Sequence, residues 1–310
     1  MIASKKGDCP YCGRCDLHHL GKLPDSYWFA GNTLAAPLPG GWLYRCKNCK
    51  LKFRNPACNP TAYEKLYDNS VVNNWSADTT RRDWELISSY ISNEIPEGSR
   101  ILDFGCYTGG LLARLGTRYE RHGVEINAAA AAIVDHYGRG KTWRDLKEIP
   151  DSTLFDVIIA CDVIEHMADP GNFLTSMSKK LAKGGIIIVT TGDADNRLWD
   201  KFGANWWYCF YPEHISFISA SWLGNFLRHS DLELKVCRTF RYRQLSIVRY
   251  TIDLILTYFY GFLPTIYIKA VGLLRKTRGV ASTESVAGNG ITADHLFIAL
   301  TKSKRGNVPG

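Results

Sequence analysis

The sequence lacks any long uninterrupted apolar run: no stretch of its 310 residues reaches the roughly 18 apolar residues of a membrane-spanning helix. It also lacks an apolar segment behind Lys5 and Lys6, which argues against a secretory signal peptide. Internal repeats are absent, and low complexity is confined to a short alanine run at 128–132. We therefore expect a cytoplasmic protein whose ten cysteines stay reduced and act as metal ligands or as inert core residues.

The composition is that of an ordinary globular protein. Hydrophobic residues make up 45% of the chain and charged residues 22%, which excludes a wholly disordered, collagen-like or coiled-coil protein. The length favours one large domain with a smaller part attached. A net charge of +8 favours an anionic partner, such as a phosphorylated small molecule, a nucleic acid or an acidic lipid surface.

The chain divides into three parts by its pattern of residue types. Residues 1–60 are rich in Cys, Pro and Gly and have too few apolar residues to build a core of their own. Residues 61–95 have the pattern of a polar helical connector. From 96 to 310, short apolar runs such as 101–104 and 157–160 alternate with helical segments, which predicts an α/β domain with a parallel sheet covered by helices on both faces.

Two Cys-x-x-Cys pairs stand in the first part, Cys9 with Cys12 and Cys46 with Cys49. Each pair forms a tight knuckle, and two knuckles complete a tetrahedral thiolate site for zinc with no position left for substrate. We therefore predict a structural Zn²⁺ ion that stabilises a zinc-ribbon domain over residues 1–60. Scattered core cysteines or a redox pair would not explain the doubled spacing. The residues that remain as rival ligands are Cys15, His18 and His19, and the one expected to be unrelated is Cys58.

A glycine-rich turn follows the first apolar run of the third part. Gly105 and Gly109 let the backbone bend tightly, and the helix that begins after them presents free N–H groups to an anionic part of a ligand. Glu125 ends the next predicted strand, where a carboxylate can accept both hydroxyls of a ribose. Together, the turn and this carboxylate predict an adenosine-containing cofactor.

Two classes of cofactor fit this arrangement. A dinucleotide needs Gly-x-Gly-x-x-Gly so that the backbone reaches a pyrophosphate, and the run from Gly105 to Gly110 breaks this pattern at Tyr107. The acidic Asp103 at the turn would oppose a pyrophosphate, whereas it suits the positively charged ammonium of a methionine moiety. S-adenosylmethionine is therefore the better fit.

On these residues the chain resembles the class I S-adenosylmethionine-dependent methyltransferases over residues 80–240 and 292–302. The positions that match the family's first motif are Asp103, Gly105, Tyr107 (where glycine is usual) and Gly109. The family's ribose-binding acid maps to Glu125 and its adenine-contacting acid to Asp145. The segment 155–170 looks like the fourth strand and following loop of the family's small-molecule branch.

The resemblance implies a Rossmann-like seven-stranded methyltransferase sheet and in-line displacement at a sulfonium methyl. The protein then has to align the acceptor at near-attack distance and, where needed, remove its proton. The residues that the resemblance implies at the cofactor are Asp103, Gly105, Cys106, Gly109, Glu125, Ile126, Asp145 and Cys161.

Two histidines are candidates for the general base, and we favour His214. His214 follows the fifth predicted strand near the carboxyl-end crevice, with Glu213 beside it and Tyr211 three residues before it. His166 lies in the loop after the fourth strand, on the same rim. For either histidine the alternative is a structural role in which hydrogen bonds hold it in place.

Zinc-ribbon methyltransferases that act on nucleotide-linked sugars carry Tyr-x-Glu-His in this region, which Tyr211-Pro-Glu-His214 matches. The resemblance implies that Tyr211, Glu213 and His214 belong to the active site. It also implies a sugar, nucleotide-sugar or glycan/lipid-linked acceptor from surface-polysaccharide or secondary-metabolite synthesis. Those sugar C-methyltransferases have a further C-terminal domain, and this chain ends soon after its last predicted strand. O-methylation is therefore at least as compatible with the sequence as C-methylation.

An apolar and basic insertion at 241–291 separates the last two predicted strands, 232–240 and 295–300. Its part from 241 to 278 has two apolar helical stretches with seven cations and one acidic residue. Apolar helices rimmed by cations suit an anionic membrane surface, which would make the protein peripheral at the inner face of a membrane. A helical cap over the active site or a dimer interface has the same pattern, and we favour one of these two. Pro264 and the charges interrupt the apolar run, which argues against a spanning helix.

Two other functions stay open. A zinc ribbon with a basic balance also suits an RNA methyltransferase. However, the ribbon has no dense Lys/Arg tract, and the sequence has neither the Asn/Asp-Pro-Pro-aromatic tetrad nor the Pro-Cys nucleophile of base methylation, so we expect no nucleic-acid substrate. The second function is that of a non-catalytic subunit with a methyltransferase fold, which binds a partner through the ribbon. The intact Asp103, Gly105, Gly109 and Glu125 argue against it.

Overall fold

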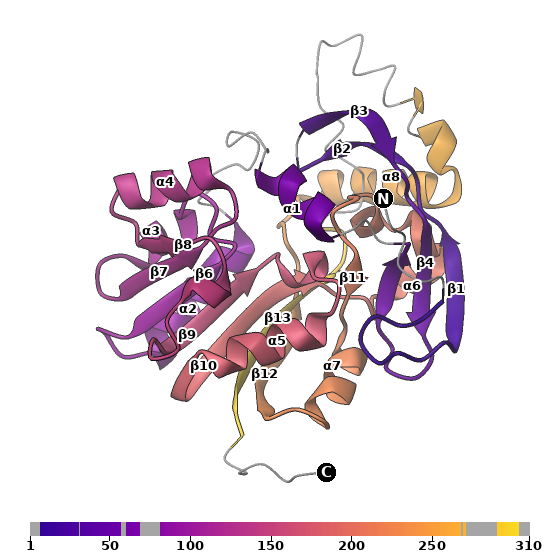
Figure 1. The fold of residues 1–310 in the computed structure, drawn as a ribbon. Coiled ribbons are helices and arrows are strands. Elements are labelled where there is room, and N and C mark those ends of the chain that lie inside the picture. The colour runs from indigo at the N-terminus through magenta and orange to yellow at the C-terminus, as the bar shows by residue number, and fades with distance from the viewer. Residues whose placement is uncertain are drawn as a thin grey trace.

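Seven strands form the centre of the molecule. The computed structural model describes residues 7–30, 32–56, 60–68, 81–267, 269–270 and 290–303; the expectations for Cys58 and for most of the insertion beyond residue 270 lie outside the described residues. The spatial order of the central sheet is β12-β13-β10-β9-β6-β7-β8 (Figure 1). Its strands are β6 (Arg100–Phe104), β7 (Glu120–Val124), β8 (Lys141–Trp143), β9 (Phe155–Cys161), β10 (Leu181–Gly192), β12 (Leu232–Phe240) and β13 (His295–Lys302).

The direction of the strands is that expected from the sequence. The five strands β10-β9-β6-β7-β8 run parallel to one another, and β13 runs antiparallel to both of its neighbours, β10 and β12. The predicted α/β fold with a seven-stranded, mostly parallel sheet is therefore confirmed. In such a sheet the carboxyl ends of the parallel strands meet along one edge, where ligands bind.

Both faces of the sheet are buried. Along β9, Val157 and Ile159 point into one apolar layer, while Ile158 and Ala160 point into the other. All four side chains are fully buried. This explains why β9 reads as a continuous apolar run instead of an alternating one.

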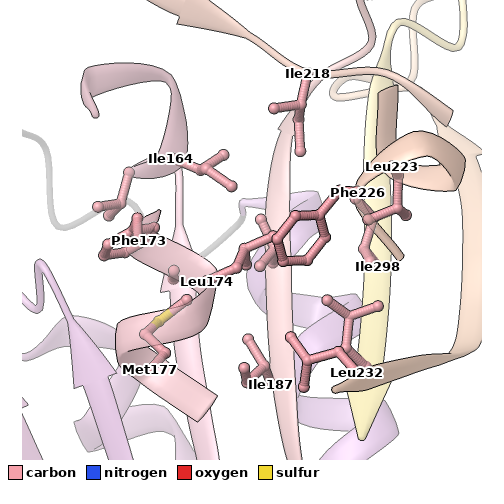
Figure 2. Packing of buried hydrophobic residues seen from close by; sticks show 14 of the residues in the cluster. Ile164, Phe173, Leu174, Met177, Ile187, Ile218, Leu223, Phe226, Leu232 and Ile298 are labelled. Carbon is pink, nitrogen blue, oxygen red and sulfur yellow. The ribbon is translucent and has the colours of Figure 1, made fainter. Parts of the chain in front are cut away.

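Helices cover the two faces. The helices around the sheet are α2 (Arg82–Glu94), α3 (Gly110–Leu115), α4 (Ala128–His136), α5 (Pro170–Lys179) and α7 (Ala220–Leu227). The first two supply side chains to one layer, and α5 and α7 supply side chains to the other. Figure 2 shows the second layer, where Leu174 of α5 and Phe226 of α7 converge on Ile187 and Ile298 of the sheet.

Side-chain caps decide where two of these helices begin. Asp169 accepts hydrogen bonds from the backbone N–H groups of Gly171 and Asn172 at 3.0 Å each, directly before α5. Asn127 caps α4 in the same way by accepting from the N–H of Ala130 at 2.9 Å. Each cap satisfies an N–H group that would otherwise lack a partner, so the helices start where the strand-end loops require.

The N-terminal strands share a sheet with the rest of the chain. They are β1 (Leu17–Lys22), β4 (Trp42–Cys46) and β5 (Lys52–Asn55), beside a separate hairpin of β2 (Ser26–Phe29) and β3 (Asn32–Leu38). The sheet has the order β1-β4-β5-β11, and β11 (Ser216–Phe217) comes from the segment after α6 (Arg197–Phe202). Lys52 on β5 is fully buried and donates to the carbonyl of Ala194 at 2.6 Å and to the carboxylate of Asp200 at 2.7 Å. These contacts fasten the cysteine-bearing region to the α/β body.

The structure also describes α1 (Pro60–Asp68) and α8 (Ile247–Phe262), and residues 264–267 are helical as well. Short 3₁₀ turns complete the fold: η2 (Leu146–Glu148), η3 (Ile164–His166), η4 (Gly203–Asn205) and η5 (Trp207–Cys209). α8 packs on η4, where Asn205 donates to the carbonyl of Gly261 at 3.0 Å. Among the described residues, no helix is long and apolar enough to cross a membrane.

Candidate active site

A pocket of about 460 Å³ opens at the carboxyl ends of β6, β7 and β9, the edge where the sequence predicts a ligand crevice. The predicted cofactor residues that line it are Asp103, Gly105, Cys106, Glu125, Ile126, Asp145 and Cys161. Of the predicted base candidates, His166 lines it. No residue of α8 is part of the lining, whereas the ring of Tyr242, at the start of the insertion, lies 5.7 Å from the guanidinium of Arg81, which does line the pocket. The role of the insertion as a cap stays a prediction.

Gly105 fixes the closest approach of the backbone to the pocket. Its φ of +77° is disfavoured for other residues, and a Cβ at this position would lie 2.7 Å from Cγ2 of Val163. Gly109, which does not line the pocket, has a φ of +74° and begins α3. The two glycines therefore have different roles. Gly105 lines the pocket, and Gly109 turns the chain into α3.

Glu125 lies where the resemblance places the ribose-binding acid. Its two carboxylate oxygens accept from the backbone N–H groups of Tyr107 at 2.8 Å and Asn127 at 2.7 Å. Burial raises the pKa of Glu125, and these backbone hydrogen bonds oppose that rise. Each oxygen keeps a further lone pair, so the carboxylate is held rigidly and can still accept hydroxyl groups.

Asp103 is 3% exposed, and its carboxyl group receives no hydrogen bond from any described residue. Burial, together with the nearby carboxylate of Glu125, raises the pKa of Asp103 to about 8, although Arg81 opposes the rise. A buried carboxyl group in this state gains most from a cationic ligand group, because a positive charge beside it restores the ionised form. An ammonium group fits this position, and a pyrophosphate does not.

The remaining cofactor candidates form the walls. Cys106 and Cys161 are thiols whose pKa burial raises well above the usual value, so they stay protonated and act by packing. Asp145 lies on the rim, where its side chain accepts from the N–H of Lys147 at 2.9 Å.

A charged cluster lies beyond Cys161, at the end of β9. Arg81 forms an ion pair with Asp162 at 2.6 Å and another with Asp83, and the thiol of Cys161 donates to Asp83 at 3.0 Å. Burial raises the pKa of Asp162 to about 7, although Arg81 opposes the rise. The second oxygen of this carboxylate is buried without a hydrogen-bond partner among the described residues, and Asp162 lines the pocket.

His166 lies at the same end of the pocket. Its Nδ1 is 3.1 Å from the carbonyl oxygen of Glu213 and 2.7 Å from the phenol of Tyr67 on α1. A carbonyl oxygen can only accept, whereas the phenol of Tyr67 can donate or accept. In the tautomer that donates from Nδ1 to the Glu213 carbonyl, the lone pair of the neutral imidazole is on Nε2. Burial lowers the pKa of His166, which favours that neutral form.

His214, Glu213 and Tyr211 stand one layer behind. Nδ1 of His214 is 2.8 Å from the carbonyl of Tyr208, and its ring lies 5.1 Å from that of His166. Burial lowers the pKa of His214 well below its usual value. The structure brings the four predicted catalytic-site residues, His166, Tyr211, Glu213 and His214, into one cluster. The three from the Tyr-x-Glu-His motif do not line the pocket. Their catalytic role stays a prediction.

Several residues that line the pocket were not predicted from the sequence to belong to the site. Tyr67 and Arg81 come from the segment that read as a connector, and nothing near them in the sequence points to a site. Asp162 has a signal that could have found it, because a carboxylate directly after a buried parallel strand stands at the ligand-binding edge.

The four predicted zinc ligands form one cluster. The sulfurs of Cys9 and Cys49 are 3.5 Å apart, as are those of Cys12 and Cys46, and all four lie within 4.8 Å of one another. A tetrahedron with Zn–S bonds of about 2.3 Å has sulfurs about 3.8 Å apart, so the donor set and its spacing fit zinc. The rival ligands Cys15, His18 and His19 are not in the cluster that the described residues form.

Comparisons with known proteins agree with this geometry. A family model described as "Methyltransferase domain" matches residues 77–235, which is just over half of the chain. The match spans the glycine turn, Asp103 and Glu125, the loop after β9 and the Tyr-x-Glu-His motif.

Relatives match a shorter stretch. The chain is 38% identical over 105 residues to the ubiquinone biosynthesis O-methyltransferase of Caulobacter sp. (strain K31), which covers 31% of this chain and 41% of that protein. It is 33% identical over 113 residues to the protein of the same name from Bradyrhizobium sp. (strain ORS 278), covering 34% and 43%. The chain thus spans about two fifths of the length of these relatives. Among solved structures, coclaurine N-methyltransferase bound to N-methylheliamine and SAH is 17% identical with a TM-score of 0.49, covering 79% of this chain and 82% of that one.

Proposed function

The chain belongs to the methyltransferase domain family, and from that premise we propose that it transfers a methyl group from S-adenosylmethionine to a small-molecule acceptor. The observation that carries the proposal is the pair of buried carboxylates, Asp103 and Glu125, that face one pocket from either side of the Gly105 turn. Asp103 would hold the methionine ammonium and Glu125 the ribose hydroxyls. When bound, the sulfonium supplies a methyl group that is already activated for displacement.

His166 is proposed as the base. With Nδ1 donating to the Glu213 carbonyl, its neutral imidazole has the lone pair on Nε2, and the residue lines the pocket. Nε2 would take the proton of an acceptor hydroxyl as the oxygen attacks, and the resulting positive charge would be stabilised by Asp162 and by the carbonyl of Glu213. His214, Glu213 and Tyr211 support this group from behind.

The acceptor is proposed to be a hydroxyl group of a sugar, nucleotide sugar or glycan/lipid-linked intermediate. The Tyr211-Pro-Glu-His214 motif supports this class, and the unpartnered oxygen of Asp162 can accept a second hydroxyl of such a molecule. The second candidate is a phenolic hydroxyl, because the matching stretch of the relatives comes from O-methyltransferases named for ubiquinone biosynthesis. Both candidates imply O-methylation.

Calorimetry with S-adenosylmethionine tests the cofactor. We expect saturable binding to the wild type and none to Asp103→Asn, which removes the carboxylate charge at nearly the same volume. The acceptor is then sought by mass spectrometry with three panels: nucleotide sugars, lipid-linked glycans and prenylated phenols. A product heavier by one methylene unit identifies the class. Absence of cofactor heat from folded wild-type protein would overturn the proposal.

We further propose that Cys9, Cys12, Cys46 and Cys49 hold one structural zinc ion. Elemental analysis of the purified protein should find about one zinc per chain. Cys46→Ser should lose it, and Cys15→Ser, which changes an exposed cysteine outside the cluster, should retain it. Equal zinc content in both variants would contradict this assignment.

Peripheral contact with an anionic membrane surface is the last part of the proposal. Apolar side chains recur every third or fourth residue along the exposed side of α8, and they are Ile247, Val248, Ile252, Ile255, Phe259 and Phe262. Lys201 lies 4.5 Å from the ring of Tyr258, and Arg249 is 61% exposed while it pairs with Asp253 at 2.9 Å, so cationic side chains stand beside this face. Apolar side chains with cations at their edge suit the boundary between acidic headgroups and lipid tails.

Flotation with vesicles of phosphatidylglycerol and phosphatidylcholine tests the membrane contact. Binding should require the anionic lipid, fall as salt rises and be lost in Ile255→Glu. Leu234→Glu is the matched control, because Leu234 is also an exposed apolar residue but lies on β12. A salt-insensitive dimer in sedimentation, with no flotation at low salt, would replace the membrane with a second copy of the chain.

A further inference from the structure

Arg54 is a buried cation on β5, in the N-terminal sheet. The residue is 4% exposed. Among the described residues, no carboxylate lies within ion-pair distance of its guanidinium. Burying a charge without a counter-charge is costly unless hydrogen bonds replace its hydration. The environment of Arg54 therefore has to supply those hydrogen bonds from neutral groups.

Backbone carbonyls supply them. Nε donates to the carbonyl of His214 at 3.2 Å, and Nη1 donates to that of Gly40 at 2.6 Å. Nη2 donates to the carbonyls of Cys209 at 3.0 Å and Tyr211 at 3.1 Å. Three of the four acceptors belong to residues 209–214, so the planar guanidinium holds this short segment at three points.

The same segment touches His166 on its other side. The carbonyl of Glu213, which lies between two of the carbonyls that Arg54 holds, accepts from Nδ1 of His166 at 3.1 Å. Two residues after Glu213, the backbone N–H of Ile215 donates to the carbonyl of Glu165 at 2.8 Å. The carbonyl of Ile215 accepts from the backbone N–H of Arg54 at 2.8 Å. The segment thus links the N-terminal sheet directly to the loop after β9.

We propose that Arg54 is a positioning residue: by holding residues 209–214 it keeps the carbonyl of Glu213 in place to fix the ring and the tautomer of His166. The proposal rests on the proposed role of His166 as the base. Without that carbonyl, Nδ1 no longer has to carry the proton, and Nε2 is no longer the fixed site of the lone pair. The N-terminal sheet would then take part in the chemistry without touching a substrate.

Other charged and titratable groups also surround His166. They are Tyr67 from α1, Glu213 and His214 from the segment that Arg54 holds, and Asp162 and Glu165 from the loop after β9. Substitution of Arg54 leaves all of these groups in the chain. Arg54→Lys also keeps the charge at position 54, so a change in the tautomer of His166 in this variant reports the position of the Glu213 carbonyl.

The test uses the full chain labelled with ¹⁵N-histidine, and it does not need the acceptor. Long-range ¹H–¹⁵N spectra give the tautomer of each histidine, and His166→Asn assigns the signal. The wild type should show His166 protonated at Nδ1. Arg54→Lys keeps the charge but cannot hold three carbonyls with one ammonium, so it should give a mixture of tautomers and a lower titration midpoint, because the lost hydrogen bond favours the charged ring.

The matched control is Lys52→Met, which removes the other buried cation of β5. Lys52 holds Ala194 and Asp200, not residues 209–214, so this variant should lose stability and leave the tautomer unchanged. Once an acceptor is found, Arg54→Lys should lower kcat about 10- to 100-fold with the affinity for S-adenosylmethionine within twofold of the wild type.

Two results would overturn the proposal. One is a wild-type His166 protonated at Nε2. The other is a folded Arg54→Lys whose His166 spectrum matches the wild type. Where Arg54→Lys does not fold, Arg54→Gln, which keeps two donors and removes the buried charge, takes its place in the same measurement. Failure of the proposed function is seen separately, as absence of heat with S-adenosylmethionine.

Discussion

The two ends of the pocket are built in different ways. At the cofactor end, Asp103, Gly105 and Glu125 lie within one short stretch of chain, on two neighbouring strands and the turn between them. At the acceptor end, Tyr67, His166 and the segment that Arg54 holds come from elements far apart in sequence. One end is a local motif and the other is a product of the whole fold. Substitutions should therefore separate cofactor affinity from turnover.

The largest effect is expected at the acceptor end. His166→Asn should lower turnover by roughly 10²- to 10⁴-fold, the usual contribution of a general base, with cofactor affinity unchanged. Tyr67→Phe is the milder partner, because it keeps the ring and removes only the hydroxyl that contacts Nδ1. Steady-state kinetics and calorimetry on the same preparations measure both quantities. Parallel loss of affinity and turnover in His166→Asn would show that the two ends are not separable.

Substitutions at the cofactor end should lower cofactor affinity more than turnover. Glu125→Ala should weaken S-adenosylmethionine binding by about 10- to 100-fold, because hydrogen bonds to a charged group contribute roughly 1.5–3 kcal/mol. Glu120→Gln is the control, since Glu120 begins the same strand but is half exposed and pairs with Arg100 and His122. Calorimetry should find wild-type affinity in the control. A weak effect of Glu125→Ala would place the ribose elsewhere.

Asp103 links cofactor binding to stability. Because its pKa is raised to about 8 in the folded state, the folded protein without cofactor holds an extra proton between about pH 4 and pH 8. Stability from this group is present at low pH and is lost as pH rises through that window, by up to about 1.4 kcal/mol per pH unit. Asp103→Asn should therefore unfold at a higher temperature than the wild type at pH 8 and bind no cofactor. Glu94→Gln, on the exposed side of α2, should change neither property. Equal thermal stability of Asp103→Asn and the wild type at both pH 5 and pH 8 would contradict the raised pKa.

The smallest effect should come from the core shared by both ends. Ile187 on β10 is fully buried, and Ile187→Val should cost about 0.5–1.5 kcal/mol of unfolding free energy. Leu234→Ala, at a half-exposed position on β12, should stay within about 0.5 kcal/mol of the wild type. Denaturant unfolding measures both. A selective loss of either cofactor affinity or turnover in Ile187→Val would break the comparison, because this residue does not line the pocket.

The same contrast explains what could be predicted from the sequence. The parallel strands, the glycine turn with Glu125 and the two cysteine pairs were predictable because each signal lies within a few neighbouring residues. The choice between the two histidines was not. His166 and His214 both follow strands at the same edge, and only the packing of Tyr208 over His214 leaves His166 as the one that lines the pocket.

Residues that act across long distances left no local signal. Arg54 reads as one more cation after a cysteine pair, and its four carbonyl partners lie up to 160 positions away in the chain. Arg81 reads as part of a polar connector, and its ion pair with Asp162 forms only when α2 packs against the sheet. Hydrogen bonds to backbone carbonyls carry no side-chain signature, so a single sequence cannot reveal them.

The pairing of β5 with β11 bears on how this protein can be recombined. Ser216 lies opposite Phe53 and Phe217 opposite Lys52, so the strand that completes the N-terminal sheet is encoded more than 150 codons downstream of it. A graft of residues 7–56 onto another methyltransferase would arrive with an open edge and an Arg54 that has lost most of its acceptors. Functional chimeras should be obtained only when residues 205–217 are transferred together with residues 7–56. In natural sequences the two segments should be inherited as one unit.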